Sequence, residues 1–155
     1  MLMLKKGDAA PGFELQDQDG NEWRLKDLQG QKVVLYFYPA DDTPGCTKES
    51  CDFRDSYSDW QKAGYVILGI SPQDTESKRA FATKYDLPFP LLADVDALIA
   101  KEYDVFRDSD MDWDGIPLVV KRSTFVIDGD GTIEQALYGV HAKSHVAELR
   151  ESLGV

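Results

Sequence analysis

The stretch that decides the fold is Val33-Val34-Leu35-Tyr36-Phe37-Tyr38-Pro39-Ala40-Asp41-Asp42-Thr43-Pro44-Gly45-Cys46, an apolar run that leads into a short polar motif. Its first six residues are typical of a buried strand. Thr43 and Pro44 then indicate a helix start, because threonine favours the N-cap and proline favours the first helical position. The stretch therefore predicts a strand, a turn and a helix, with Cys46 in the first helical turn.

Cys46 lies three residues after the predicted cap, where the backbone N–H groups of a helix have no helical carbonyl to pair with. These groups and the positive end of the helix dipole stabilise a thiolate, which is the reactive form of cysteine. The second cysteine of the chain, Cys51, follows five residues later. We therefore expect a reactive thiol at Cys46. The alternative is that both are incidental buried thiols, because free cysteine often serves as a small apolar residue.

Helix geometry separates the two cysteines. On an ideal helix, where each residue advances about 100° and 1.5 Å, Cys46 shares a stripe with Phe53, Tyr57 and Trp60, whereas Cys51 turns away from it. The two Cα atoms would then be about 8.7 Å apart, and a disulfide requires a separation below about 7 Å. Either the cysteines never bond, or the helix partly unwinds to let them. The second case predicts a reduced helical form and an oxidised, locally unfolded form.

The rest of the chain alternates short strands and helices, without an internal repeat or linker. This order predicts an α/β fold in which helices flank a central mixed sheet, preceded by an N-terminal β-hairpin, with residues 1–155 as a single domain. The predicted strands are 13–15, 22–25, 33–38, 65–71, 89–92, 123–128 and 132–138. The predicted helices are 44–62, 76–85, 95–103 and 144–153, and 107–115 is predicted to be an exposed loop.

Composition limits the possible partners and compartment. The net charge of −11 disfavours binding to nucleic acid or to an anionic membrane surface. The sequence has neither a signal peptide nor an apolar segment long enough to span a bilayer, so we expect a cytoplasmic protein. In such a reducing compartment, a pair of cysteines is more often catalytic or redox-sensing than a permanent disulfide.

Metal and nucleotide sites find little support in the sequence. Two thiols with His141 and His145 do not match the ligand spacing of zinc fingers. The histidines, four residues apart, could bind a metal weakly by themselves, but we interpret them as a solvated pair and predict no metal. The chain also lacks the glycine-rich fingerprint of dinucleotide binding.

The motif Pro39-x3-Thr43-x2-Cys46 resembles the active-site pattern of the peroxiredoxins. Cys51, five residues further on, resembles the Q-type subgroup, also called bacterioferritin comigratory protein. The resemblance covers almost the whole chain and implies a thioredoxin-like fold. Its other matching segments are residues 7–13, 46–55, 69–71, 89–94 and 122–128.

The resemblance implies a thiol-dependent peroxidase that reduces hydrogen peroxide and organic hydroperoxides. No metal, haem, flavin or other cofactor is implied, and the expected reductant is thioredoxin or a similar dithiol protein. Q-type relatives are often monomeric, so we expect a monomer, without excluding a dimer. Two other classes stay open at this point. A thiol–disulfide oxidoreductase is disfavoured because the chain lacks Cys-x-x-Cys, and a redox-switched binding protein would use helix melting to recruit a partner.

The resemblance also implies a role for each residue of the motif. Cys46 is similar to the peroxidatic nucleophile, and Cys51 to the resolving thiol that condenses with its sulfenic acid. Arg122 is similar to the cation that lowers the pKa of the nucleophile and stabilises the departing oxygen. Thr43 is similar to the hydroxyl that hydrogen-bonds the thiolate and the peroxide, and Pro39 to the residue that walls the pocket from water.

Two further residues complete the expected site. Gly45 joins Thr43, Cys46 and Arg122 as substrate-binding residues, and Glu49 is expected to position Arg122. From the residues alone, Arg122 could also be an ordinary surface arginine, and Thr43 only a cap. The acidic loop 108–114 departs from the family pattern because extra residues break its Gly-Ile-x-Arg spacing, which leaves the role of this loop open.

Overall fold

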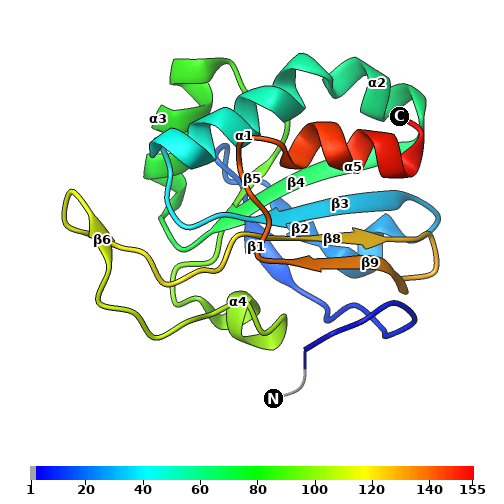
Figure 1. Cartoon of the computed structure of the whole chain (residues 1–155), viewed down its shortest axis with the longest axis horizontal. Helices are drawn as coiled ribbons and strands as arrows, with labels where there is room; N and C mark the ends of the chain where they lie inside the picture. The colour runs from blue at the N-terminus through cyan, green and yellow to red at the C-terminus, as the bar shows by residue number, and fades with distance from the viewer. Residues whose placement is uncertain (1–2) are drawn as a thin grey trace.

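The protein has three layers, seen edge-on in the computed structural model, which describes residues 3–155 (Figure 1). A five-stranded sheet forms the middle layer. The face above it is covered by α1 (Pro44–Asp55), α2 (Tyr57–Lys62), α3 (Thr75–Tyr85) and α5 (His145–Leu153). The face below it is covered by α4 (Leu98–Glu102) and the N-terminal segment.

The sheet mixes parallel and antiparallel strands, as predicted. Its spatial order is β5-β4-β3-β8-β9, with β3, β4 and β5 parallel and with β8 and β9 antiparallel to their neighbours. The bounds are β3 Lys32–Phe37, β4 Tyr65–Ser71, β5 Leu91–Ala93, β8 Ser123–Ile127 and β9 Ile133–Tyr138. The sheet and its flanking helices confirm the predicted fold class.

Strand β3 is central and buried on both faces. Val33, Leu35 and Phe37 pack into the core below the sheet. Val34 and Tyr36 pack into the core above it, together with Cys46 of α1. This alternation follows from the period of two along a strand, and burial on both faces explains why the run has no polar alternation.

The register between β3 and β8 brings distant parts of the chain to one place. Phe37 at the end of β3 pairs with Ser123 at the start of the antiparallel β8. Arg122, which immediately precedes β8, therefore lies at the same sheet edge as residues 38–43, from which α1 begins.

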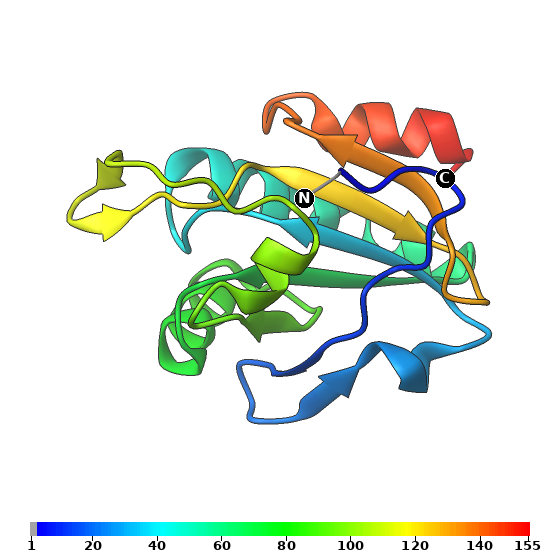
Figure 2. The same ribbon diagram turned by 90° about the horizontal axis from the view of Figure 1, so that it is seen from below.

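The N-terminal hairpin is present as a separate two-stranded sheet (Figure 2). Its strands are β1 (Glu14–Gln16) and β2 (Glu22–Arg24), and the 3-10 helix η1 (Leu25–Leu28) follows them. The buried Asp17 holds the turn, because its carboxylate accepts hydrogen bonds from Asp19 N and Asn21 N and from Trp23 Nε1.

Two predicted helices differ from the observed ones. The predicted helix 44–62 is divided at Ser56, whose hydroxyl donates to the carbonyl of Asp52 and also accepts from Trp60 Nε1. Such side-chain bonds compete with the helical pattern. The predicted helix 95–103 is only α4, because Ala97 has a left-handed backbone with φ of 55°. No helix within residues 3–155 is long and apolar enough to cross a membrane.

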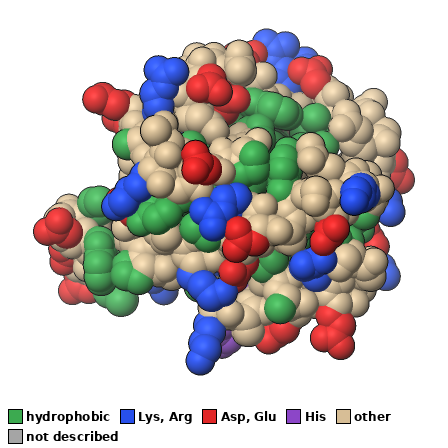
Figure 3. Space-filling model, turned by 90° about the horizontal axis from the view of Figure 1, so that it is seen from above, with side chains coloured by type: hydrophobic (Ala, Val, Ile, Leu, Met, Phe, Trp, Pro, Cys, Tyr) green, Lys and Arg blue, Asp and Glu red, His purple; other side chains and the backbone are tan. Residues whose placement is uncertain are grey.

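The acidic loop is exposed but contains a short hairpin that was not predicted. Its strands are β6 (Asp112–Trp113) and β7 (Ile116–Pro117), and they project from one side of the molecule (Figures 1 and 2). Met111 and Trp113 are about half exposed there, at 57% and 48%. Hydrophobic and acidic side chains mix on this projection, at the left of the space-filling view (Figure 3).

Candidate active site

Cys46 is the third residue of α1, as predicted. The helix begins at Pro44, with Thr43 in extended conformation at the N-cap position. Cys46 is 1% exposed and belongs to the same buried cluster as Phe53 and Trp60. The predicted core-facing stripe is therefore confirmed, and the sulfur lies at the helix end where backbone N–H groups stabilise negative charge.

Arg122 bridges Cys46 to a buried carboxylate. Its Nη2 donates to Cys46 Sγ at 3.3 Å, and its Nη1 donates to Glu49 Oε1 at 2.7 Å. The Arg122 side chain is 15% exposed and that of Glu49 is fully buried. Although burial disfavours the charge, the attraction of Glu49 and Cys46 outweighs it and raises the pKa of Arg122. Arg122 is thus a permanent cation beside the sulfur, and it is not an ordinary surface arginine.

Glu49 anchors the guanidinium at the cost of its own desolvation. Burial raises its pKa to about 7, against the opposing effect of Arg122. Its second oxygen, Oε2, has no hydrogen-bond partner among residues 3–155. Because an unpaired buried carboxylate oxygen is costly, the stabilising contact of this side chain is the one to Arg122. The structure therefore brings Glu49 to the location expected for a residue that positions Arg122.

Gly45 leaves room for the guanidinium. A Cβ atom at this position would lie 3.0 Å from Arg122 Nη2 and 3.4 Å from the Cβ of Ala142. Contacts this short would displace one of the side chains. The smallest residue is thus required by close approach, and Gly45 lies beside the predicted site.

Thr43 and Pro39 lie on the loop that leads into α1. Thr43 is buried, and its hydroxyl donates to the carbonyl of Ala40 at 2.9 Å. Thr43 is the N-cap residue, as predicted, although its hydroxyl accepts no N–H of the helix. The hydroxyl also makes no hydrogen bond to Cys46 in the structure. Pro39 is half-buried, and its carbonyl accepts from Gln73 Nε2 at 3.2 Å.

Cys51 lies on the same unbroken helix but in different surroundings. It is half-buried and free, as is Cys46. Burial raises the pKa of its thiol; Asp55 and Asp52 act in the same direction, and Arg54 and Lys48 act against it. With α1 intact from Pro44 to Asp55, ideal geometry keeps the two Cα atoms about 8.7 Å apart. The structure therefore corresponds to the predicted reduced, helical form.

The interpretation of the histidines as a solvated pair is wrong for one of them. His145 is 3% exposed, and its Nε2 shares a 2.7 Å hydrogen bond with Thr124 Oγ1. Burial lowers its pKa to about 4, so its ring is neutral at physiological pH. His141 is exposed. No group of three or more possible metal-binding side chains occurs within residues 3–155.

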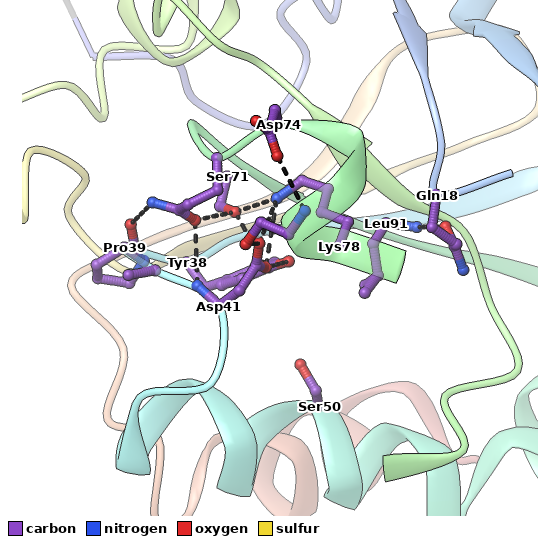
Figure 4. A network of polar contacts seen from close by, with 12 residues as sticks. Gln18, Tyr38, Pro39, Asp41, Ser50, Ser71, Asp74, Lys78 and Leu91 are labelled. Atoms are coloured by element: carbon purple, nitrogen blue, oxygen red, sulfur yellow. Dashed lines mark hydrogen bonds and ion pairs between the residues drawn. The ribbon is translucent and has the colours of Figure 1, made fainter. Parts of the chain in front are cut away.

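Sequence reasoning missed a buried polar network next to the site. Figure 4 shows Lys78 of α3 pointing toward Asp41 and Ser71. Lys78 is completely buried, and its ammonium lies 3.3 Å from both carboxylate oxygens of Asp41. The available signal was helical spacing, because Lys78 shares its buried stripe with Phe81 and Ala82. Lysine is so rarely buried that this spacing was not interpreted.

The fold agrees with comparisons to known proteins. The model of the AhpC/TSA family matches residues 6–136. A curated peroxiredoxin of Mycobacterium tuberculosis (strain H37Rv) is 45% identical over 152 residues, which are 98% of this chain and 96% of the relative. The chain belongs to the peroxiredoxin family. A chloroplastic peroxiredoxin Q of Populus jackii is 47% identical over 131 residues, covering 84% of this chain and 59% of the relative.

Solved structures place this peroxiredoxin in the Q-type branch. A structure of the bacterioferritin comigratory protein of Xanthomonas campestris has a TM-score of 0.84 and 32% identity, and it covers 92% of this chain and 90% of that one. That structure was determined to study alkyl peroxide reduction by the Xanthomonas protein. The resemblance stated from the sequence is thus confirmed, and the chain is a thiol-dependent peroxidase.

Proposed function

We propose that this peroxiredoxin reduces hydrogen peroxide and organic hydroperoxides through Cys46, and that Cys51 resolves the oxidised enzyme. The observation that carries the assignment is the 3.3 Å contact from Arg122 Nη2 to Cys46 Sγ at the N-terminus of α1. A fixed cation and a helix N-terminus are the two features that convert a cysteine into a nucleophilic thiolate. Alkyl peroxide reduction by the Xanthomonas relative supports the organic substrates.

In the first step, the Cys46 thiolate attacks one oxygen of the hydroperoxide. A sulfur–oxygen bond forms and the oxygen–oxygen bond breaks, so sulfur is oxidised by two electrons to a sulfenic acid. The other oxygen leaves as hydroxide or alkoxide and takes a proton from water. Donors aimed at the developing charge stabilise this transition state. Arg122, Thr43 and the backbone N–H groups that begin with Gly45 are the donors proposed here, and Pro39 limits access of water.

In the second step, the Cys51 thiol condenses with the sulfenic acid of Cys46 and releases one water molecule. Because the two residues are out of bonding reach on an intact helix, the first turns of α1 must unwind before the sulfurs meet. Unwinding also exposes the new disulfide. A thiolate of the reductant then attacks it by thiol–disulfide exchange.

The finer points of the assignment follow from the same reasoning. We propose thioredoxin or a similar dithiol protein as the reductant, because the oxidised enzyme offers it an exposed disulfide. Resolution within one chain needs no second copy, which supports a monomer. Residues 1–155 are proposed to act as one domain in the cytoplasm, with no resident cofactor.

Peroxide consumption with excess dithiothreitol tests the assignment. Wild-type protein should consume peroxide over many turnovers, and Cys46→Ser should abolish this activity. Cys51→Ser is the matched control, because it removes the other thiol of the same helix and should retain the first reaction with peroxide. Surviving turnover in Cys46→Ser would overturn the assignment. A single oxidation without turnover in the wild type would instead favour a redox-switched binding protein.

A further inference from the structure

The loop 39–43 is held from behind by the network around Asp41 (Figure 4). The carboxylate of Asp41 accepts hydrogen bonds from Tyr38 OH at 2.6 Å and from Ser77 Oγ at 2.8 Å. The same carboxylate forms the ion pair with Lys78. Asp41 is 6% exposed, so these partners replace water around its charge.

Lys78 is the most unusual member of this network. It is 0% exposed, and burial lowers its pKa, although Asp41 acts in the opposite direction. Its ammonium also donates to Ser71 Oγ at the end of β4 and lies 5.3 Å from the centre of the Tyr38 ring. Because burying an ammonium is costly, such a pair adds little net stability compared with apolar packing. The contribution of the Asp41–Lys78 pair is then the geometry that it fixes.

Gln73 transmits that geometry to the backbone of the loop. Its Oε1 accepts from Asp41 N at 3.1 Å and from Ser71 Oγ at 2.7 Å. Its Nε2 donates to the carbonyl of Pro39 at 3.2 Å. One amide side chain therefore holds both ends of the segment 39–41, and Ser71 joins it to Lys78.

The held segment leads directly to the reacting sulfur. The carbonyl of Ala40, within the segment, accepts the hydroxyl of Thr43, and Thr43 is the N-cap residue three positions before Cys46. A shift of this loop would move Thr43 and Pro39 relative to the sulfur. Arg122 immediately precedes β8 and is not part of this loop. A shift of the loop would therefore leave the contact between Arg122 and Cys46 in its position.

We propose that Lys78, acting through Asp41 and Gln73, is a positioning residue that holds the loop 39–43 in the geometry needed for peroxide attack. The proposal rests on the function proposed for Cys46. Attack on an oxygen–oxygen bond requires the sulfur, the peroxide and its donors to be aligned, and small misplacements are costly. Alkylation by iodoacetamide requires an accessible thiolate and no such alignment. A variant that disturbs only the alignment should therefore slow the reaction of Cys46 with peroxide and leave its alkylation by iodoacetamide unchanged.

The test uses Lys78→Met in a Cys51→Ser background, which leaves Cys46 as the sole thiol. Second-order rate constants for hydrogen peroxide and for iodoacetamide are measured from pH 5 to 9, and their high-pH plateaus are compared. The peroxide plateau should fall about tenfold or more, while the iodoacetamide plateau stays within threefold. A folded variant whose two plateaus stay within twofold of the parent, or fall in parallel, would overturn the proposal.

Two companion variants keep the test decisive. Gln73→Met breaks the links to Pro39 and Asp41 without touching the buried ion pair, and it should lower the peroxide plateau about fivefold. It decides the question if Lys78→Met does not fold, and an unchanged ratio of the plateaus in Gln73→Met then overturns the proposal. Arg79→Met is the control on the same helix, because Arg79 pairs with Asp19 in exposed positions outside the loop 39–43 and should change neither plateau beyond twofold.

Failure of this proposal is distinguishable from failure of the proposed function. If the function is wrong, Cys46 in the Cys51→Ser parent will not react rapidly with peroxide. If only the positioning role is wrong, the parent will react rapidly and the Lys78 and Gln73 variants will match it.

Discussion

Cys46 lies in the first turn of α1 with Arg122 Nη2 3.3 Å from its sulfur, whereas Cys51 lies in the second turn on a half-exposed face with Asp55 and Asp52 nearby. Cys46 combines burial with a fixed cation and the helix N-terminus. For Cys51, burial raises the pKa of the thiol against the opposing effect of Arg54. Two residues of one type on one helix therefore differ in their surroundings, because a guanidinium contacts the sulfur of Cys46 and burial dominates at Cys51.

We infer that the location of each cysteine on the helix decides which of the two reacts first. In the proposed mechanism, the thiol that Arg122 contacts reacts first with peroxide, and the other thiol does not compete for the substrate. In the same mechanism, Cys51 reacts only after Cys46 has been oxidised and α1 has unwound.

Removal of the Arg122 guanidinium should greatly lower the reactivity of Cys46 with peroxide. Arg122→Met should lower the second-order rate constant for peroxide by about 10² to 10³, the usual cost of losing a donor aimed at developing charge. Stopped-flow tryptophan fluorescence measures this rate. Lys121→Met, which removes an exposed neighbouring cation, is the control and should stay within twofold. A loss below tenfold in Arg122→Met would contradict the role of Arg122.

The carboxylate that anchors Arg122 should give a distinctive pH dependence of stability. Because burial raises the pKa of Glu49 from 4.5 to about 7, the folded protein keeps a proton on Glu49 that the unfolded chain releases in this window. The contribution of Glu49 to stability therefore falls as pH rises from 4.5 to 7.

Glu49→Gln removes this dependence. The free energy of unfolding of the variant, relative to wild type, should rise by about 1–3 kcal/mol from pH 5 to pH 8. Urea unfolding at each pH measures it. A difference that stays flat, or that falls with pH, would show that the carboxyl titrates normally in the folded protein.

Displacing the Arg122 guanidinium by a larger neighbour should lower the reactivity of Cys46 without removing any charge. Gly45→Ala places a Cβ atom 3.0 Å from Arg122 Nη2, and displacement of the guanidinium should lower the peroxide rate about tenfold. Gly12→Ala is the matched control, because a Cβ atom there meets nothing within 4 Å. Equal rates in the two variants would mean that the guanidinium tolerates displacement.

Loss of the second thiol should affect the first reaction least. In Cys51→Ser, the first oxidation by peroxide should stay within twofold of wild type, since the bonds of Arg122 to Cys46 and Glu49 do not involve Cys51. Intact mass should then show one added oxygen in place of the loss of two hydrogens. A large decrease in the first rate would assign Cys51 a part in peroxide attack.

Local patterns in the sequence predicted the elements on which Cys46 depends. The apolar run 33–38 predicted β3, Thr43-Pro44 predicted the start of α1, and helical spacing predicted that Cys46 faces the core. Each of these signals lies within a few turns of chain. Arg122 was found only through the family resemblance, because its approach to Cys46 depends on the β3–β8 register across 76 residues.

The parts that were not predicted depend on tertiary contacts. The burial of Lys78 and His145 follows from partners on other elements, namely Asp41 and Thr124, and neither residue type signals burial by itself. The break at Ser56 arises from its own side-chain hydrogen bonds, which a hydrophobic pattern does not record. The sequence thus predicted the site along the chain, and its supporting network required the folded structure.

Hydrogen exchange of the reduced and oxidised enzyme, combined with intact mass, tests whether α1 unwinds when Cys46 and Cys51 form a disulfide. One equivalent of peroxide should cause a loss of two hydrogens, and amides in residues 44–51 should lose protection while those of β3 and β4 keep theirs. Reduction with dithiothreitol should restore the protection. A Cys46–Cys51 disulfide that forms with α1 fully protected would contradict the unwinding of α1. Complete oxidation without any disulfide would contradict resolution by Cys51.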